Sequence, residues 1–243
     1  MTTSESMLSP AVEGVTPRRQ ANLWGDAWRR RIRNKLAVAG MAVILLLVFV
    51  AIFAPVLAKE HYAEANFEEP FLSPSWEHPF GTDNLGRDML SRIIWGARIS
   101  LGVALLAQFL TLAIGLPIGA LAGYLGGRWD TITMRGVDVM YAFPRLLFVL
   151  LLMVVLGPGL VTIFVAIGIS GWVTESRLLR AQFLSLKERD FIKAARVSGT
   201  GGFGIILRHL MPNSLTPIIV AMTFGIPTAI FIEAGLSFIG VGI

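Results

Sequence analysis

The chain has 243 residues, of which 54% are hydrophobic and only 15% are charged, against about 45 to 50% and about 25% in an ordinary soluble domain. This balance argues against a water-soluble globule, and the absence of cysteine excludes disulfides, thiolate catalysis and cysteine-ligated metal clusters. With only three histidines, we also expect no metal site. Apolar runs of about 20 residues recur, each long enough to cross roughly 30 Å of hydrocarbon. We therefore predict an all-α, polytopic transmembrane bundle.

The residues before the first apolar run are basic. Residues 1–22 show no hydrophobic period and predict a disordered tail. Residues 23–35 mix tryptophan, leucine and isoleucine with arginine, which suits either a basic helix lying at the membrane interface or a positive-inside stop signal. Seven basic residues oppose three acidic ones in residues 1–35. The positive-inside rule then predicts a cytoplasmic N-terminus.

Five membrane segments are predicted, with the ranges 36–58, 99–125, 136–157, 160–180 and 214–240. The first is too long for the apolar part of a signal peptide and lacks a small-x-small cleavage site, so we interpret it as a retained anchor. The loop 59–98 is acidic and is expected outside, whereas the loop 181–213 is basic and is expected inside. Residues 99–243 would form the transmembrane core. Prolines inside these segments predict bent helices: Pro117, Pro144 and Pro227.

Glycines recur every four residues in the second segment. This spacing lines one helix face with hydrogen atoms and lets another helix approach closely. The neighbour could be a helix of the same chain, a second subunit or the wall of a pathway, and the sequence leaves these open. The predicted packing residues are Gly115, Gly119, Gly123 and Gly127.

Four charged side chains fall within or at the ends of the predicted segments, where burial of a charge is costly. They are Asp138, Arg145, Glu175 and Glu233. Asp138 is expected to face cytoplasmic water with Arg135 or Arg145 as its partner. Glu233 is expected to be a solvated residue near the outer face. The alternative for Asp138 and Glu233 is a role in a gate or pathway.

One glycine-rich motif matches a nucleotide-binding pattern but lacks the structural context of that pattern. Residues 199–204, GTGGFG, fit the dinucleotide-binding pattern, but a helix rather than a strand is predicted before them, and position 219 is not acidic. We interpret these glycines as a turn between two short helices. The surrounding loop 181–213 is too apolar for a free linker, which indicates a short ordered helix that packs on a partner.

Within this loop the sequence resembles a known family. Residues 193–199, KAARVSG, followed by IILRHLMPN at 205–213, are similar to the E-A-A-x-x-x-G loop of ABC importer permeases. In that family the loop is a coupling helix that docks in a groove of the cytoplasmic ATPase. The resemblance implies that role for Lys193, Ala194, Ala195, Gly199, His209, Pro212 and Asn213.

A second resemblance narrows the family. Residues 78–88, HPFGTDNLGRD, and 233–240, EAGLSFIG, are similar to signatures of the C-type permease of dipeptide, oligopeptide and nickel importers. The resemblance implies a type I ABC importer fold in a bacterial or archaeal plasma membrane. It also implies a second permease, two cytoplasmic ATPases and an external binding protein as partners, besides membrane lipid. The chain itself would bind no cofactor, because ATP and Mg belong to the ATPases.

The chain also departs from the family pattern. Lys193 replaces the motif's glutamate, and Arg145 and Glu175 stand where small or neutral residues are usual. Such permeases have six membrane helices, whereas five are predicted here, so we expect a truncated chain. The cargo, whether dipeptide, oligopeptide, nickel chelate or glutathione, stays open.

Other classes of function are less well supported by the sequence. An ion-coupled secondary transporter would use Asp138 and Glu233 as its titrating groups, but it would not need the apolar cytoplasmic loop. No paired catalytic residues and no nucleotide, zinc-protease or hydrolase motif occur, so we expect neither an enzyme nor a catalytic residue. We expect no nucleic-acid partner.

Overall fold

The structure is a computed structural model that describes residues 32–242. The predicted tail 1–22 and most of the predicted interfacial helix 23–35 lie outside the described residues. The chain divides into two units, residues 1–49 and 50–243, each of which is considered by itself. The described part is helical, and its only β pairing is an isolated bridge between Thr82 and Asp88.

The first membrane helix, α2, spans Lys35–Leu57 and is strongly apolar. The side-chain oxygen of Asn34 accepts hydrogen bonds from the backbone N–H groups of Leu36 and Ala37, at 3.1 and 3.2 Å, and so satisfies two free donors of the first turn. Nearly all side chains of α2 are exposed. An apolar helix of this length suits a membrane anchor.

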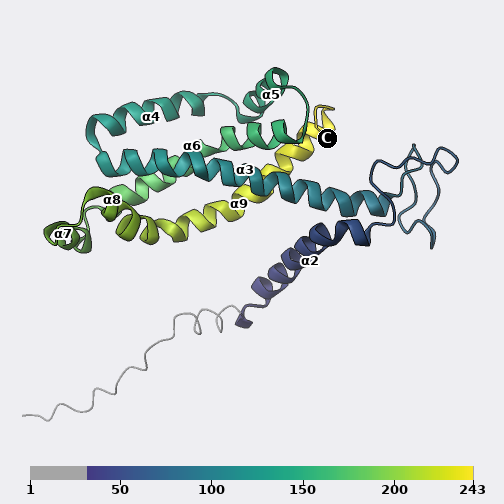
Figure 1. The fold of residues 1–243 in the computed structure, drawn as a ribbon, viewed down its shortest axis with the longest axis horizontal. Helices are drawn as coiled ribbons and strands as arrows, with labels where there is room; N and C mark the ends of the chain where they lie inside the picture. Colours follow the sequence, from purple (N-terminus) through teal and green to yellow (C-terminus); the bar gives the residue numbers. More distant parts are fainter. Residues whose placement is uncertain (1–31, 243) are drawn as a thin grey trace, which may run out of the picture. The chain divides into compact units, whose positions relative to one another are not determined.

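Three long helices form the bundle of residues 50–242: α3 (Met89–Leu125), α6 (Leu160–Leu186) and α9 (Met211–Phe238). They lie against one another along much of their length (Figure 1). α3 begins ten residues before its predicted start at 99. The carboxylate of Asp88 explains this, because it accepts a 2.7 Å hydrogen bond from the N–H of Ser91 and caps the helix before the apolar run begins.

The glycines of α3 lie directly on the backbone of α6. A Cβ atom added to Gly115 would be 2.8 Å from the Trp172 carbonyl oxygen, and one added to Gly123 would be 2.9 Å from the Arg180 carbonyl oxygen. At Gly119 the added atom would collide with the Ser176 carbonyl oxygen. The predicted close approach is therefore present, and the neighbour is a helix of the same chain. Gly127 is an exception, because α3 ends at Leu125 and Gly127 begins the next helix.

The contacts of these glycines also give the relative direction of the two helices. Gly115 faces Glu175, Gly119 faces Leu179 and Gly123 faces Phe183, so α3 and α6 run parallel. Two consecutive parallel spans require that the chain between them crosses back to the side where α3 began. The connecting residues 126–159 must therefore traverse the membrane.

This crossing is broken into two helices. The predicted single segment 136–157 is instead α4 (Gly127–Ala142) followed by α5 (Arg145–Leu156), with an angle of 85° between them. Pro144 has no N–H and disfavours helical geometry in the residue before it, and Phe143 indeed has φ −81° and ψ 130°. Among the described residues four helices are long and apolar enough to span a membrane, and the bent pair gives a fifth if it is one broken span.

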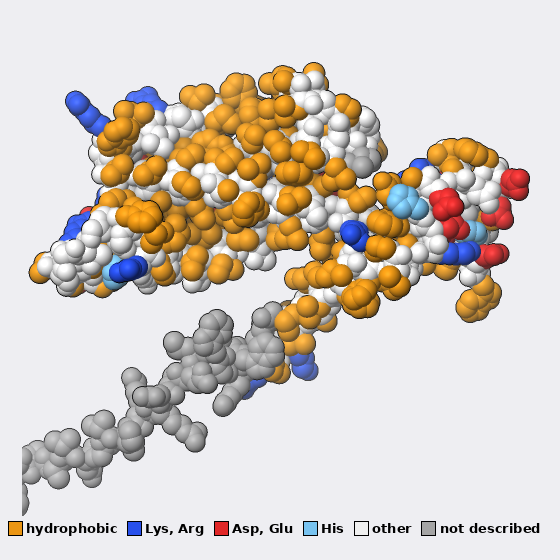
Figure 2. Space-filling view, in the orientation of Figure 1, with side chains coloured by type: hydrophobic (Ala, Val, Ile, Leu, Met, Phe, Trp, Pro, Cys, Tyr) orange, Lys and Arg blue, Asp and Glu red, His pale blue; other side chains and the backbone are white. Residues whose placement is uncertain are grey.

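Side-chain chemistry divides this bundle into zones. Hydrophobic side chains cover most of its visible surface, whereas acidic side chains gather at the loop between α2 and α3 (Figure 2). Lys and Arg side chains gather at the other end, near α4 and α7 (Figure 2). This distribution is typical of a helical membrane protein with an apolar belt and two polar ends.

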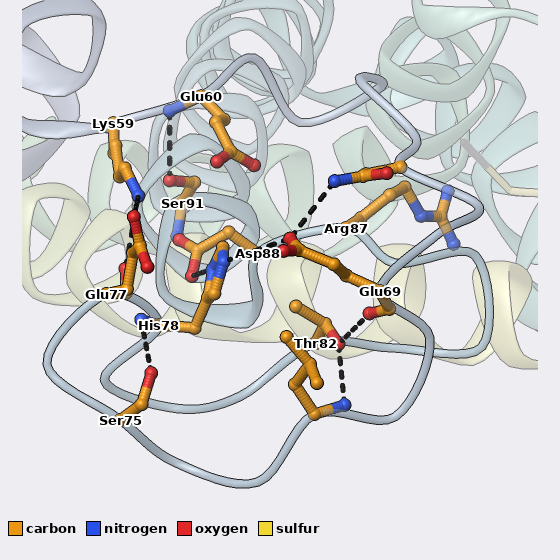
Figure 3. A network of polar contacts seen from close by, with 12 residues as sticks. Lys59, Glu60, Glu69, Ser75, Glu77, His78, Thr82, Arg87, Asp88 and Ser91 are labelled. Carbon is orange, nitrogen blue, oxygen red and sulfur yellow. Dashed lines mark hydrogen bonds and ion pairs between the residues drawn. The ribbon is translucent and has the colours of Figure 1, made fainter.

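The loop between α2 and α3 folds back on itself through buried polar contacts (Figure 3). His78 Nδ1 lies 3.2 Å from the carboxylate of Asp88, and the hydroxyl of Thr82 donates a 2.6 Å hydrogen bond to the Glu69 carbonyl oxygen. Gly86 has φ +73°, and a Cβ there would collide with the Asn66 carbonyl oxygen. The motif HPFGTDNLGRD thus builds a rigid loop at the start of α3.

Asp83 is the acceptor that holds the middle of this motif. Its carboxylate accepts the N–H of Leu85 at 2.8 Å, Nε of Arg87 at 2.7 Å and Nη1 of Arg92 at 2.6 Å. Burial raises the pKa of Asp83, but the hydrogen bonds and charge of Arg87, together with the Leu85 N–H, outweigh burial and lower the pKa to about 2. The carboxylate is therefore ionised throughout the physiological range.

The low pKa of Asp83 predicts an acid-sensitive loop. Because the pKa in the folded state, about 2, lies below the unfolded value near 3.9, ionised Asp83 contributes about 2 kcal/mol above pH 4, and this is lost as the pH falls towards 2. We expect Asp83→Asn to lower the melting temperature of the purified protein at pH 7, and the difference from wild type to shrink towards pH 2. Glu68→Gln, on an exposed side chain of the same loop, should have no effect. A difference that does not change with pH would contradict this account.

Candidate functional site

The residues between α6 and α9 form an ordered segment, not a free linker. α7 spans Asp190–Val197, α8 spans Gly202–Ile205, and a π-helical turn, η1, covers Ile206–Leu210 and leads into α9. The predicted loop 181–213 is shorter in the structure, because α6 continues to Leu186. We call residues 187–210 the connecting segment.

The connecting segment is anchored by apolar side chains that point into the bundle. Ile192 of α7, Ile205 of α8 and Leu210 of η1 are fully buried together with Leu179 and Phe183 of α6. Burying a side chain of this size stabilises by roughly 1.5 to 3 kcal/mol. The segment is therefore fixed to α6 and α9 at several points, so that a force applied to it is transmitted to both helices.

Gly199 ends α7 as its position in the sequence predicts. It has φ +80°, its N–H donates to the Arg196 carbonyl oxygen at 3.0 Å, and the N–H of Thr200 donates to the Ala195 carbonyl oxygen at 3.0 Å. This left-handed termination is cheap for glycine and strained for other residues. It turns the chain sharply from α7 into α8.

The outer surface of the connecting segment carries exposed apolar side chains. Val197 is 90% exposed, Phe203 is 75% exposed and Leu207 is 49% exposed. Residues 198–201, Phe203, Leu207 and Arg208 also border an open cavity of about 460 Å³. Large exposed apolar side chains outside the membrane-spanning helices favour contact with a protein partner. We call Phe203 and Leu207, which border the same cavity, the apolar patch.

The predicted coupling residues are divided between the two faces of this segment. Lys193 and Ala194 are exposed, and Lys193 Nζ forms a 3.3 Å ion pair with Asp190 on the surface of α7. Ala195, expected to dock in a partner, is instead buried against the chain itself. Motif spacing does not say which face of an eight-residue helix points inward, so the docking role of Ala195 stays a prediction. Val197 and Phe203 are two of the exposed apolar residues that the motif did not single out.

The remaining predicted residues lie at the start of α9. Pro212 has no N–H for the helical hydrogen bond, and a π-turn precedes it, in which the N–H of Met211 donates to the Ile206 carbonyl oxygen. The side-chain amide of Asn213 donates a 2.6 Å hydrogen bond to the His209 carbonyl oxygen. His209, Pro212 and Asn213 therefore shape the junction of the connecting segment with α9.

The charged residues of α4 pair with α6. Asp138 accepts a 2.5 Å hydrogen bond from Arg177 Nη2, so the predicted partners Arg135 and Arg145 were wrong. Asp130 forms a two-pronged ion pair with Arg180, at 2.5 and 2.6 Å, which no pattern in the sequence predicts. Both pairs link residues about 40 to 50 positions apart, and a pattern in one sequence gives no information on such contacts.

Glu233 lies elsewhere and is largely buried. It is 7% exposed, and its carboxylate accepts hydrogen bonds from the hydroxyls of Ser100 at 2.9 Å and Ser237 at 3.2 Å. The expectation of a solvated residue is corrected, because α3 covers this face of α9. Glu233 contacts α3 and Asp138 contacts α6, so the structure does not bring the two candidate pathway acids together.

Comparison with known proteins identifies the family. Residues 115–243 match the family described as binding-protein-dependent transport system inner membrane component, and residues 22–74 match the N-terminal transmembrane domain of oligopeptide transport permease C. The chain belongs to this permease family. The family is one of membrane transport components, not of enzymes.

Individual relatives agree over most of the chain. The dipeptide transport permease DppC of Bacillus subtilis is 46% identical over 218 residues, which cover 90% of this chain and 68% of that protein. The oligopeptide transport permease OppC of the same organism is 42% identical over a match that covers 93% of this chain and 74% of that protein. The glutathione transport permease GsiD of Escherichia coli is 40% identical over a match that covers 94% of this chain and 76% of that protein.

The two neighbouring alanines of α7 give a matched test of its orientation. Ala195→Trp should lower the melting temperature of the purified protein, because the indole cannot fit in the buried contact with the bundle, and overpacking costs about 1 to 3 kcal/mol. Ala194→Trp places the same side chain in solvent and should leave the melting temperature unchanged. Equal effects of the two variants would show that α7 is not anchored as described.

Proposed function

We propose that this permease is the membrane-spanning subunit of an ATP-driven importer of di- or oligopeptides. The family and the relatives support a peptide importer, since the three relatives named above carry dipeptides, oligopeptides or glutathione. The single structural observation that carries the coupling role is the anchored connecting segment with its exposed apolar patch. A transporter that works without a cytoplasmic partner would not need such a surface.

The proposed partners follow from this assignment. The apolar patch docks on a cytoplasmic ATPase, a second permease completes the pathway, a second ATPase serves that permease, and an external binding protein delivers the peptide. ATP and Mg are held by the ATPases, and this chain binds no cofactor. The N-terminus and the connecting segment both face the cytoplasm, as the basic residues around them favour.

The proposed mechanism uses the rigid attachments of the connecting segment. Closure of the ATPases on ATP displaces α7 and α8, and the buried anchors Ile192, Ile205 and Leu210 pass the displacement to α6 and α9. α3 follows α6 because their backbones are in direct contact. The pathway thereby opens to one side of the membrane at a time.

The ion-coupled alternative receives less support. Such a transporter would need acidic groups that can take up and release ions along a pathway. Asp138 is instead paired with Arg177, and Glu233 accepts hydrogen bonds from Ser100 of α3 and Ser237 of α9. These arrangements suit structural roles. An ion-coupled mechanism would also give the apolar patch no function.

The apolar patch provides the test of the proposed function. Phe203→Ser should leave the protein folded in the membrane, because the ring makes little contact with its own chain, but should reduce co-purification of the ATPases and peptide-stimulated ATP hydrolysis at least fivefold. Truncating an aromatic anchor of an interface typically costs 1 kcal/mol or more. Phe80→Ser, on an exposed phenylalanine of the loop before α3, is the matched control. Normal coupling in Phe203→Ser would contradict the docking role of the patch.

A further inference from the structure

Arg145 stands directly after the break in the membrane crossing. It is the first residue of α5, next to Phe143 and Pro144, where the chain turns through 85°. Its Nε donates a 3.1 Å hydrogen bond to the Ser170 hydroxyl, which in turn donates to the Ile167 carbonyl oxygen at 2.8 Å. Nη2 reaches the same carbonyl oxygen only at 3.5 Å. A guanidinium has five N–H donors, so most of its hydrogen-bonding capacity is unused.

Arg145 also has no carboxylate partner within the part of the chain that the structure describes. Asp130 and Asp138 of α4 are paired with Arg180 and Arg177, and Glu175 is buried against Gly115 of α3. A cation at membrane depth costs several kcal/mol unless it faces water, a ligand or an opposite charge. The guanidinium therefore lacks the anion that its position calls for.

The space in front of Arg145 is large enough for a small ligand. The cavity at the break has a volume of about 360 Å³, within the range of ligand sites. Aromatic side chains and hydroxyls share its wall: Tyr141, Phe143, Phe148, Ser170 and Thr174. Gly171 contributes room, because a Cβ there would lie 3.1 Å from Nη2 of Arg145.

The broken backbone fits a ligand site as well. Non-helical backbone at membrane depth is tolerated where it lines a cavity, and broken helices at this depth commonly border the substrate. We propose that Arg145 binds the terminal carboxylate of the transported peptide in this cavity. The proposal rests on the proposed function, because it takes the peptide as the cargo. A carboxylate accepts two parallel N–H bonds from a guanidinium, and every unblocked peptide carries one whatever its side chains.

The test measures peptide binding to the permease complex itself. The complete complex of permeases and ATPases is placed in nanodiscs without the binding protein, so that selection by that protein does not contribute. A dipeptide bearing a photoreactive side chain is crosslinked in its free-acid form and in its C-terminal amide form. We expect the free acid to label this chain at least tenfold more than the amide, and an excess of unlabelled free acid, but not of amide, to compete.

Variants identify the group responsible. Arg145→Gln should reduce free-acid labelling about tenfold and abolish the preference over the amide, whereas Arg145→Lys, which keeps the charge, should retain part of the preference. Arg135→Gln removes an exposed arginine of α4 outside the cavity and should behave as wild type. Wild-type labelling of Arg145→Gln would overturn the proposal, and so would equal labelling by the acid and amide in the wild-type complex, a result that does not depend on the variants' folding.

A parallel uptake assay separates the two proposals. Wild-type complex with its binding protein should accumulate peptide in proteoliposomes only when ATP is supplied. If this uptake occurs but the free acid and the amide label the chain equally, only the role of Arg145 is wrong. If no ATP-driven peptide uptake occurs, the proposed function and the role of Arg145 both fail.

Discussion

Gly115, Gly119 and Gly123 allow α3 to lie directly against the backbone of α6, and this contact positions most of residues 50–242. Three glycines on one face remove the side chains that normally keep helix axes 8 to 10 Å apart. The gain in the membrane comes from van der Waals packing, because lipid is as apolar as the helix surface and offers no hydrophobic driving force. No larger residue is tolerated at these three positions, because each added Cβ would meet backbone or Cβ atoms of α6.

The parallel direction of α3 and α6 determines the rest of the topology. The chain must cross back between them, and Pro144 breaks that crossing into α4 and α5. The break exposes the first turn of α5, and the Arg145 side chain reaches from there to α6. At the other end α6 continues into the connecting segment, whose anchors pack on Leu179 and Phe183 beside the glycine contact. One helix pair thus supports both the cavity at the break and the proposed docking surface.

The sequence predicts those features that depend on local pattern. Apolar runs of sufficient length gave the membrane helices, glycine spacing gave a close helix contact, and Gly199 gave a left-handed helix end, because each depends on residues within a few turns of one another. The start of α3 was missed because Asp88 caps a helix whose first ten residues include Arg92 and Arg98 and are not apolar enough to count as membrane-spanning. The bend at Pro144 was expected, but neither its 85° angle nor the start of α4 at Gly127 could be inferred from the proline alone.

Features that depend on tertiary contacts could not be predicted. The burial of Ala195 and exposure of Val197 are set by how α7 packs on the bundle, and the burial of Glu233 is set by α3. The partner of Asp138 is 39 positions away. That Arg145 has no carboxylate partner among residues 32–242 is a property of the tertiary structure, since it emerges only when the partners of Asp130 and Asp138 are known.

The contact between α3 and α6 is tested most directly by a bulky side chain on the glycine face. At Gly119, leucine would meet the Ser176 backbone and the Leu179 Cβ atom, 3.1 Å from the added Cβ, whereas at Gly102 of the same helix nothing lies within 4 Å. Thermal unfolding of the purified protein should show a melting temperature about 5 °C or more below wild type for Gly119→Leu, from overpacking of roughly 1 to 3 kcal/mol, and no loss for Gly102→Leu. Equal melting temperatures for Gly119→Leu and wild type would contradict the packing on which this account of the molecule depends.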